Sequence, residues 1–305
     1  MLDRPLDGVQ IIAVASRSKS RADTFANEFS IPRRYGNYEE LLDDPDIDAV
    51  YIPLPQHLHC EYAIKSAYAG KHVLVEKPAA LTVEELERML AACSTNGVLF
   101  MEAFMYRFKR IHNRVKEMVV AGAIGKLRYI DFNWCYNIRE LARSPFRLEK
   151  SAGGGALYDL GIYAADFFHF ITDGQPVLLH ASIHRDSPMG VDMFSHATCT
   201  IGDVVATFTC GLTCDANFYT VCGELGSIHV PGSLSGRFVE NVMGVHLLKE
   251  DRRYEEIFPA ENPYRKEIEH FALCIEQREE PMVKDEDSLR NIGLIEEIME
   301  RGVSF

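Results

Sequence analysis

Glu76-Lys77-Pro78 is the stretch of the chain whose residue types most directly suggest chemistry. It follows an apolar run at 72–75. A run of this length, with Gly70 before it and Pro78 after it, indicates a buried parallel strand. Open α/β sheets bind ligands at the carboxyl ends of such strands. A partly buried lysine in such a place can serve as an acid or base, because burial lowers a lysine pKa. The alternative is a surface lysine that pairs with Glu76.

The composition is that of a globular protein and argues against several functions. The chain has 305 residues, of which 47% are hydrophobic and 25% charged, enough for two domains. Its formal net charge of -13 argues against nucleic-acid binding, which needs a basic surface. No apolar run reaches the length of a membrane span, and no signal peptide opens the chain. We therefore expect no membrane partner and a cytoplasmic location.

The cysteines and histidines do not form a metal-binding pattern. The eight cysteines include no C-x-x-C pair, and most lie inside apolar segments. This distribution favours free thiols in a reducing cytoplasm over a disulfide framework or a zinc site. His57 and His59 have no evident acidic or cysteine partner, so capping and packing roles are expected for them, and no metal.

Short apolar runs alternate with helical patterns over the first hundred residues. Thr82 and Glu85 form a capping box that marks the start of one helix. Such alternation predicts a parallel, doubly wound sheet. The expected strands are 9–15, 49–52, 72–75 and 98–101, and the expected helices are 19–29, 38–42, 57–68 and 82–93.

The pattern changes near Leu127, where long strands begin to follow one another directly. Short turns that contain Gly or Asp between such strands predict a large, mostly antiparallel sheet. The fold class is therefore α/β plus α+β, with a Rossmann-type dinucleotide-binding domain at 1–107 and a substrate-binding and oligomerisation domain at 108–305. The expected strands are 127–136, 177–185, 191–201, 203–211, 216–224, 226–231 and 243–249, and the expected helices are 153–171, 263–277 and 285–301.

The residues after the first strand suggest which dinucleotide would bind. The run at 9–16 is similar to the second strand of a dinucleotide-binding sheet, which ends at the adenosine ribose. Arg17 stands where NAD-specific sheets have an acidic residue, and an arginine there accommodates a 2′-phosphate. Arg17, with Ser16 and Arg21, therefore suggests NADP over NAD. The alternative is an ordinary basic start of a surface helix.

The chain contains no G-x-G-x-x-G turn, the usual opening of a dinucleotide-binding sheet. The run Gly153-Gly154-Gly155 does not fit, because it lies far downstream. The missing strand, turn and helix amount to about 25–30 residues on the usual size of a βαβ unit. We expect a Rossmann-type sheet truncated at its first βα unit, with two unpaired strand edges and weak cofactor binding. The expected explanation is that the chain is a truncated form or fragment of an active enzyme. A natural form that folds but binds NADP poorly and a substitute loop elsewhere are the alternatives.

Four ordered segments together resemble a known family, and they are 13–29, 38–82, 101–108 and 153–167. In them the chain is similar to the glucose–fructose oxidoreductase and inositol dehydrogenase superfamily, and to its branch of dimeric trans-dihydrodiol dehydrogenases and NADP-dependent sugar dehydrogenases. The resemblance implies NADP-dependent hydride transfer at a CH–OH group of a sugar, polyol or trans-dihydrodiol. We also expect a homodimer or tetramer through the C-terminal sheet, because one face of such a sheet is free to bury against a twin.

The resemblance assigns catalytic roles to three residues. Lys77 corresponds to the catalytic lysine of the family, and Tyr163 falls where the family has its acid or base. Asp159 precedes Tyr163 by four residues, so one helix face would present both to the cleft. The ammonium of Lys77 is expected to lower the pKa of the tyrosine, while Asp159 orients the lysine or the substrate. Lys77 and Tyr163 could exchange roles, since coupled groups titrate as a pair.

The other matched residues are expected to line the cleft. The glycine run at 153–155 is expected to leave room for the cofactor. Arg147 could pair with a phosphate, line the substrate cleft or lie on the surface. The expected cofactor contacts are Ser16, Arg17, Arg21, Pro53, Leu54, Pro55, His57, Glu76, Lys77 and Arg147, and the expected substrate contacts are Phe104, Arg107, Trp134, Asp159 and Tyr163.

The second hypothesis is non-enzymatic. A cofactor-impaired, truncated relative could act as a sugar-binding or oligomer-forming module. The presence of Lys77, Asp159 and Tyr163 together favours the enzyme.

Overall fold

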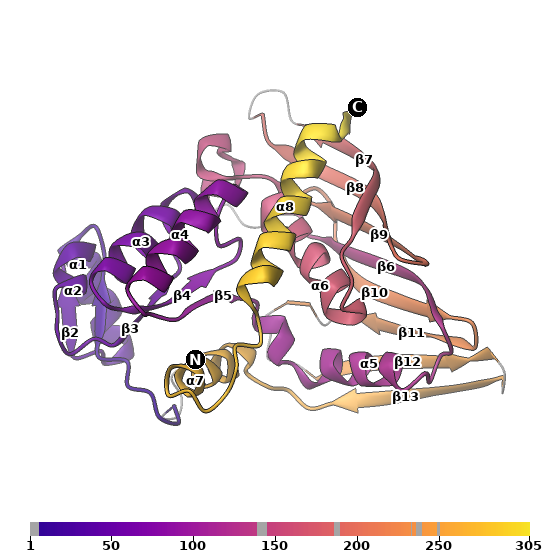
Figure 1. The fold of residues 1–305 in the computed structure, drawn as a ribbon, viewed down its shortest axis with the longest axis horizontal. Coiled ribbons are helices and arrows are strands. Elements are labelled where there is room, and N and C mark those ends of the chain that lie inside the picture. Colours follow the sequence, from indigo (N-terminus) through magenta and orange to yellow (C-terminus); the bar gives the residue numbers. More distant parts are fainter. Residues whose placement is uncertain (1–5, 139–144, 186–189, 233, 236–239, 249–250) are drawn as a thin grey trace.

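Two small parallel sheets and their flanking helices form the N-terminal part of the protein (Figure 1). The computed structural model describes residues 6–138, 145–185, 190–232, 234–235, 240–248 and 251–305. Strands β1 and β2 pair in parallel, and β3, β4 and β5 form a second parallel sheet in that order. The elements are β1 Ala13–Ala15, α1 Lys19–Phe29, β2 Arg33–Tyr35, α2 Tyr38–Leu42, β3 Ala49–Ile52, α3 His59–Tyr68, β4 His72–Glu76, α4 Val83–Thr95 and β5 Phe100–Ala103.

The two parallel sheets are separate in the described part of the chain. No strand pairs with both β1 and β3, so each of these two strands has one edge without a partner. The sequence predicted a strand over 9–15, but the strand is only Ala13–Ala15, because its single neighbour β2 is three residues long. Val9 forms only an isolated bridge with Leu6. β2 itself was not predicted, since Arg33–Tyr35 contains no apolar run. The other predicted elements here agree with the structure within two residues.

A nine-stranded sheet dominates the described C-terminal part, with the order β13-β12-β11-β10-β6-β9-β8-β7-β14. Only the β6–β9 and β7–β14 pairs are parallel, which confirms the predicted large, mostly antiparallel sheet. β13 was not predicted, because its charged residues lack apolar alternation. The strands are β6 Leu127–Cys135, β7 Val177–Arg185, β8 Asp192–Ile201, β9 Val204–Gly211, β10 Ala216–Gly223, β11 Gly226–Pro231, β12 Asn241–Leu247, β13 Arg252–Phe258 and β14 Val303–Ser304.

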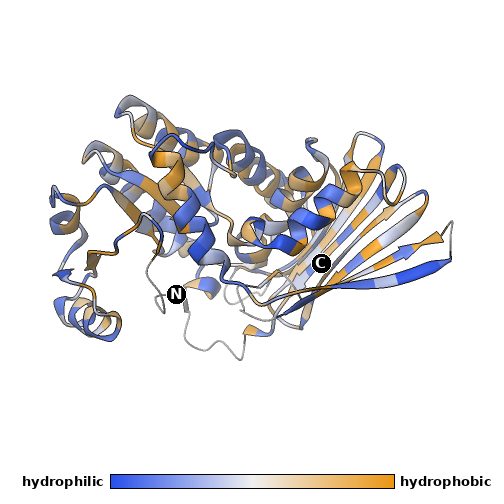
Figure 2. Ribbon diagram, turned by 90° about the horizontal axis from the view of Figure 1, so that it is seen from below, coloured by the Kyte–Doolittle hydropathy of each residue, from blue (hydrophilic) through white to orange (hydrophobic). Residues whose placement is uncertain are grey.

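Helices cover one face of the large sheet, and no described helix covers the other (Figure 1). Residues on the covered face, such as Phe132, Phe208 and Tyr219, are fully buried against these helices. Hydrophobic and hydrophilic bands alternate along the strands in Figure 2, as expected for a sheet with one face in the core. The helices of this part are α5 Arg110–Val120, α6 Ile162–Thr172, α7 Pro263–Ile275 and α8 Asp285–Arg301.

Helix α8 joins the two parts of the molecule. It contacts α4 and β5 on one side and α6 and β7 on the other. Helix α7 packs against the short 3-10 turn Met105–Phe108 that follows β5. Among the described residues, no helix combines the length and the apolar character needed to cross a membrane.

Candidate active site

Lys77 lies directly after β4, at the carboxyl end of the three-stranded sheet. The Lys77–Pro78 peptide bond is cis. The N–H of Ala79 donates to Oε1 of Glu102 at 2.9 Å, and burial raises the pKa of this carboxyl to about 7. Glu102, on the neighbouring strand β5, therefore holds the turn that carries the lysine.

His59 ties this turn to the loop that was predicted to line the nicotinamide. Its Nδ1 is 2.9 Å from the carbonyl oxygen of Pro78, and its Nε2 is 2.7 Å from that of Leu54. The ring is buried, and burial lowers its pKa. His59 therefore packs the loop in place, whereas His57 is exposed at the loop surface. The described residues contain no group of three or more His, Cys, Asp or Glu that could hold a metal ion.

Asp159 accepts hydrogen bonds from three side chains at once. Nζ of Lys77 donates to Oδ1 at 3.0 Å and to the main-chain oxygen of Asp159 at 2.6 Å. The hydroxyl of Tyr136 donates to Oδ2 at 2.5 Å, and Nε of Arg147 donates to the same oxygen at 2.9 Å. The side chains of Lys77 and Asp159 are 11% and 7% exposed. The structure thus brings together Lys77, Asp159 and Arg147.

Two cations keep Asp159 charged. Burial alone would raise its pKa, but the charges of Lys77 and Arg147 and the hydrogen bond from Tyr136 outweigh burial and lower the pKa to about 2. At neutral pH the ionised carboxylate therefore holds the ammonium of Lys77 in one position.

The segment that carries Asp159 is a π-helical turn at Leu157–Gly161, and Tyr163 lies in α6, which follows it. The sequence predicted one helix over 153–171, but the glycines at its start adopt other conformations, with φ of 78° at Gly153 and 118° at Gly155. Single π-helical turns frequently occur at functional sites. Here the turn directs the carboxylate of Asp159 toward Lys77.

The glycine run packs closely against neighbouring residues. A Cβ on Gly154 would lie 2.6 Å from the carbonyl oxygen of Arg147, and a Cβ on Gly155 would lie 2.0 Å from Oδ1 of Asp192. Oδ2 of Asp192 accepts the N–H of Leu157 at 2.7 Å. The glycines allow this close packing, which fixes the start of the helix.

Tyr163 is buried beside Lys77 among aromatic rings. Nζ of Lys77 is 4.9 Å from the centroid of the tyrosine ring, and the rings of Trp134 and Phe104 are at 4.4 and 5.6 Å. Burial, and then the charge of Glu76, raise the pKa of Tyr163 well above its ordinary value. The expectation that Lys77 lowers this pKa is therefore wrong for the structure described, since burial dominates and the phenol stays neutral.

Glu76 faces Tyr51 and makes no salt bridge with Lys77. Its carboxylate accepts a hydrogen bond from the hydroxyl of Tyr51 and another, at 3.3 Å, from the main-chain N–H of Lys77. Burial raises the pKa of Glu76. Burial and the charge of Glu76 also raise the pKa of Glu267 on α7, whose Oε1 is buried with no described partner. Two buried carboxyl groups, those of Glu76 and Glu267, thus have raised pKa values and act electrostatically on Tyr163.

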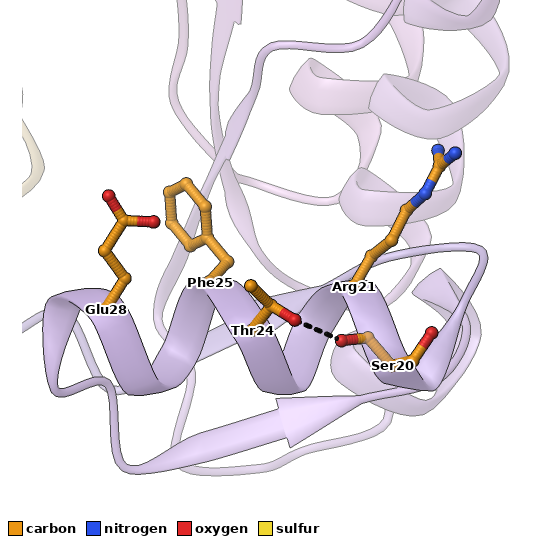
Figure 3. Close-up of a pocket in the computed structure, with 5 residues that line it drawn as sticks. All are labelled: Ser20, Arg21, Thr24, Phe25 and Glu28. Atoms are coloured by element: carbon orange, nitrogen blue, oxygen red, sulfur yellow. Dashed lines mark hydrogen bonds between the residues drawn. The ribbon is translucent and has the colours of Figure 1, made fainter.

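The residues predicted to hold a 2′-phosphate lie at the start of α1. Arg17 is exposed, and within the described residues neither its guanidinium nor that of Arg21 pairs with a carboxylate. Both cations are therefore available to an anion. Both arginines lie in the part of the chain that contains the β1–β2 sheet, and no contact joins them to Lys77. Arg21 lines an exposed pocket together with Ser20, Thr24, Phe25 and Glu28 (Figure 3).

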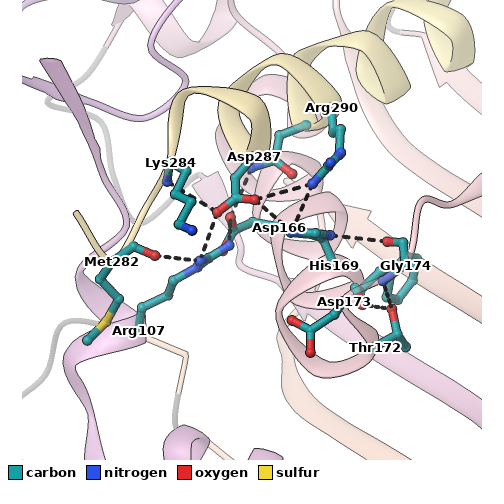
Figure 4. A network of polar contacts seen from close by, with 12 residues as sticks. Arg107, Asp166, His169, Thr172, Asp173, Gly174, Met282, Lys284, Asp287 and Arg290 are labelled. Carbon is teal, nitrogen blue, oxygen red and sulfur yellow. Dashed lines mark hydrogen bonds and ion pairs between the residues drawn. The ribbon is translucent and has the colours of Figure 1, made fainter. Parts of the chain in front are cut away.

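Arg107 was predicted to bind substrate, but the structure places its guanidinium in a buried network between α6 and α8 (Figure 4). Nη2 and Nε donate to the two carboxylate oxygens of Asp166 at 2.6 and 2.8 Å. Nη1 donates to the carbonyl oxygen of Met282 at 2.9 Å and to Asp287 at 3.3 Å. The side chain is 5% exposed. These buried partners occupy its guanidinium, so we do not include Arg107 in the proposed site.

The sequence missed Tyr136, one of the three donors to Asp159. Tyr136 follows the last residue of β6 and stands two residues after Trp134, so both side chains lie on the same side of the strand. That spacing was the only signal in the sequence. Trp134 and Phe104, predicted to contact substrate, are 9% and 0% exposed and pack on the ring of Tyr163.

The described residues offer groups for the two ends of a dinucleotide, but no loop for the pyrophosphate at its centre. Arg17 and Arg21 offer unpaired cations at one end. The loop Pro53–Pro55, half-exposed and tied to the turn of Lys77, offers a surface at the other. In the described chain no strand joins the β1–β2 sheet to the β3–β4–β5 sheet, and no G-x-G-x-x-G turn follows β1 or β3 to hold a pyrophosphate.

Comparison with known proteins identifies the family. Residues 2–104 match the oxidoreductase family with an NAD-binding Rossmann fold, and residues 112–229 match the GFO/IDH/MocA C-terminal domain. D-xylose 1-dehydrogenase (NADP(+)) 2 of Haloferax volcanii is 32% identical over 96% of this chain and 90% of its own length. An oxidoreductase of Rhizobium meliloti is 40% identical over 63% of this chain, and the match spans 57% of that relative.

A solved structure has the same fold along nearly the whole chain. The structure of a 3-ketoreductase from Actinomadura kijaniata, in complex with NADP and TDP-benzene, matches with a TM-score of 0.90 and 28% identity. The match covers 97% of this chain and 90% of that one. With both domain matches in chain order and a relative aligned over 96% of the chain, the chain belongs to the GFO/IDH/MocA family of oxidoreductases.

Proposed function

We propose that the protein is an NADP-dependent oxidoreductase that interconverts a CH–OH group and a carbonyl group of a sugar, polyol or trans-dihydrodiol. One observation carries the proposal. The ammonium of Lys77, held by the ionised carboxylate of Asp159, lies over the ring of a buried, neutral Tyr163 at the carboxyl end of a parallel strand. A cation and a proton donor side by side suit a reaction in which charge develops on a substrate oxygen.

Lys77 is the group that would polarise the substrate oxygen. An ammonium has three N–H donors, and Asp159 accepts two of them through its carboxylate and main-chain oxygens. The third donor is free to reach a carbonyl or hydroxyl oxygen. Asp159 therefore positions the lysine and leaves it with one donor for the substrate.

Tyr163 is the group that would move the proton. Its pKa is raised by burial, so the phenol enters the reaction protonated and suits donation to an oxygen that becomes a hydroxyl. In the oxidative direction the proton would have to leave through Lys77 or Tyr163. The protonated phenol is the form of Tyr163 that reduction of a carbonyl would need.

A bound NADP would supply or accept the hydride. The residues that would hold it are Arg17 and Arg21 at the adenosine end, the loop Pro53–Pro55 with His57 at the nicotinamide end, and Arg147 beside Asp159. The relative from Haloferax volcanii is named for NADP(+), and the ketoreductase structure contains NADP. Solved forms of that ketoreductase include one with a tyrosine replaced by phenylalanine and one with a lysine replaced by alanine.

Calorimetric titration with NADP and NAD, followed by a substrate screen, tests the proposal. We expect NADP to bind more tightly than NAD, and Arg17→Asp to abolish that preference while leaving the fold intact. NADP reduction with xylose, glucose and trans-dihydrodiols, and NADPH oxidation with the matching carbonyl compounds, would then identify the substrate class. Failure of the protein to bind either dinucleotide would contradict the proposed cofactor.

The second candidate is a cofactor-impaired module that binds sugar or forms oligomers. The separate β1–β2 and β3–β4–β5 sheets favour it, because a pyrophosphate would lie where the described chain offers no loop. In that case sugars would bind in titrations without NADP, and no hydride transfer would be detected with any substrate. Binding of sugar that requires NADP would instead support the enzyme.

We also propose that the protein is cytoplasmic and forms a homodimer or tetramer through the uncovered face of the large sheet. Along β6 and β9 this face presents Tyr129 and Val205, which are 36% and 40% exposed. Light scattering after gel filtration would give the mass. Tyr129→Glu together with Val205→Glu should shift it to the monomer, whereas an unchanged mass would place the interface elsewhere.

A further inference from the structure

A pair of thiols lies where β6 ends, next to the proposed active site. Cys135 is the last residue of β6, and its main-chain neighbours across the sheet are Gly211 on β9 and Ala216 on β10. Cys214 lies in the short connection 212–215 that joins these two strands. The connection therefore crosses the end of β6, and it places Cys214 over Cys135.

The two thiols lie against each other but differ in exposure. Cys135 is 3% exposed, whereas Cys214 is exposed to solvent. Sγ of Cys135 packs against Gly211, where an added Cβ would lie 3.2 Å from it. Burial, and then the neighbouring thiol of Cys214, raise the pKa of Cys135 to about 12. The pair thus combines the exposed sulfur of Cys214 with the buried sulfur of Cys135.

Main-chain contacts fix both segments relative to each other. Tyr136 donates its N–H to the carbonyl oxygen of Gly211 at 3.0 Å, and Ile138 donates to that of Leu212 at 3.0 Å. The N–H of Asn137 donates to Oδ1 of Asp215 at 3.1 Å. The residues that follow Cys135 are therefore bonded to residues on both sides of Cys214, so the two segments stay in register.

We propose that Cys135 and Cys214 are a reversible redox site that takes hydrogen peroxide as oxidant and forms an intramolecular disulfide. Cys214 attacks one peroxide oxygen, so an S–O bond forms, the O–O bond breaks, and the leaving hydroxide takes the thiol proton as water. Sulfur is oxidised to sulfenic acid while the peroxide is reduced. The sulfur of Cys135 then attacks that of Cys214, so the S–S bond forms, the S–O bond breaks, and a second water leaves. A dithiol reductant restores the pair.

The disulfide would act on the site through Tyr136. A disulfide brings its two sulfurs to about 2.05 Å, closer than thiols in contact. Cys135 directly precedes Tyr136, whose hydroxyl donates to Asp159. Oxidation is thus expected to alter the contact that helps to hold Asp159 and Lys77, although formation of the disulfide does not depend on the proposed enzyme activity.

Oxidation of the intact protein with hydrogen peroxide tests the site. After reduction and removal of reductant, peroxide should lower the number of titratable thiols in the denatured protein by two from the eight of the chain. Peptide mass spectrometry should find Cys135 joined to Cys214 within one chain, and dithiothreitol should restore both thiols.

Three variants separate this site from general thiol oxidation. In Cys214→Ser, Cys135 should remain a free thiol after peroxide treatment. In Cys135→Ser, oxidation should stop at a sulfenic acid on Cys214, which dimedone traps. Cys222→Ser, at another partly exposed cysteine, should behave like the unaltered protein. Oxidation of Cys214 without a link to Cys135, or a link only between two chains, would overturn the proposal.

Discussion

Lys77 and Asp159, which are 82 positions apart in the sequence, are joined by two hydrogen bonds from one ammonium group. The bond to the main-chain oxygen is 2.6 Å long and the bond to the carboxylate is 3.0 Å long. The lysine is therefore positioned by a fixed part of the chain as well as by a charge. Replacement of either residue should disturb the other.

Lys77→Met should lower turnover by about 10²- to 10⁴-fold, the range for loss of a positioned acid or base. Loss of the cation should also raise the pKa of Asp159, which Lys77 lowers in the structure. Steady-state kinetics with the identified substrate checks the first effect. Lys71→Met is a matched control, because Lys71 is also buried and donates to a main-chain oxygen, that of Asp44. Full turnover in Lys77→Met would rule out the assignment.

Tyr136→Phe should move the acid limb of the pH–rate profile upward. The hydroxyl of Tyr136 helps to keep the pKa of Asp159 at about 2, and its loss leaves only Lys77 and Arg147 to do so. Turnover near neutral pH should change less than in Lys77→Met, because Asp159 stays ionised there. Tyr129→Phe, on the uncovered side of β6, is the control and should leave the profile unchanged. An unshifted acid limb in Tyr136→Phe would argue against control through Asp159.

Arg107→Met should destabilise the fold and leave the Michaelis constant of the folded enzyme unchanged. Removal of one partner from a buried ion pair costs about 3–5 kcal/mol, and here Asp166 would lose its cation, whereas Asp287 would keep its contacts with Arg290 and His169. Urea unfolding measures the loss. Arg114→Met removes only exposed pairs and should cost at most about 1 kcal/mol. A raised Michaelis constant with unchanged stability would restore Arg107 as a substrate contact.

Asp192 should make the protein less stable as the pH rises. Burial raises its pKa from the ordinary 3.8 to about 7 in the folded state. Between these values the folded state keeps a proton that the unfolded state has lost, so stability falls by about 1.4 kcal/mol per pH unit. Above pH 7 the contribution is constant.

Asp192→Asn should remove this slope. Urea unfolding at several values between pH 4 and 7 compares the two proteins, and Asp203→Asn, at an exposed carboxylate, is the control. Parallel stability curves for the protein and Asp192→Asn would show that Asp192 does not retain its proton on folding.

Features that depend on local sequence could be predicted, and features that depend on distant contacts could not. The position of Lys77 follows from an apolar run and a proline, and most strands and helices have similar local signals. The direction of Arg107 depends on Asp166 and Asp287, which lie 59 and 180 positions away. Its role in the network was therefore invisible in the sequence.

The sign of the pKa shift of Tyr163 shows the same limit. The sequence named a cation that would lower this pKa, and the structure does place Lys77 beside the ring. Burial among Trp134, Phe104 and other rings has the larger effect and reverses the sign. The balance of charge and desolvation depends on packing, which a pattern of residues does not contain.

The separation of the two parallel sheets has a consequence for local opening of the molecule. Residues 13–42 reach their neighbours mainly through side chains, among them the Glu39–Lys65 ion pair and the contact of the Tyr38 and Tyr62 rings. Only two residues of α1 are buried. We therefore expect this unit to unfold on its own, with faster amide hydrogen exchange in β1 than in β4. A ligand that spans Arg17 and Lys77 would slow exchange in β1, so binding could be detected without any turnover.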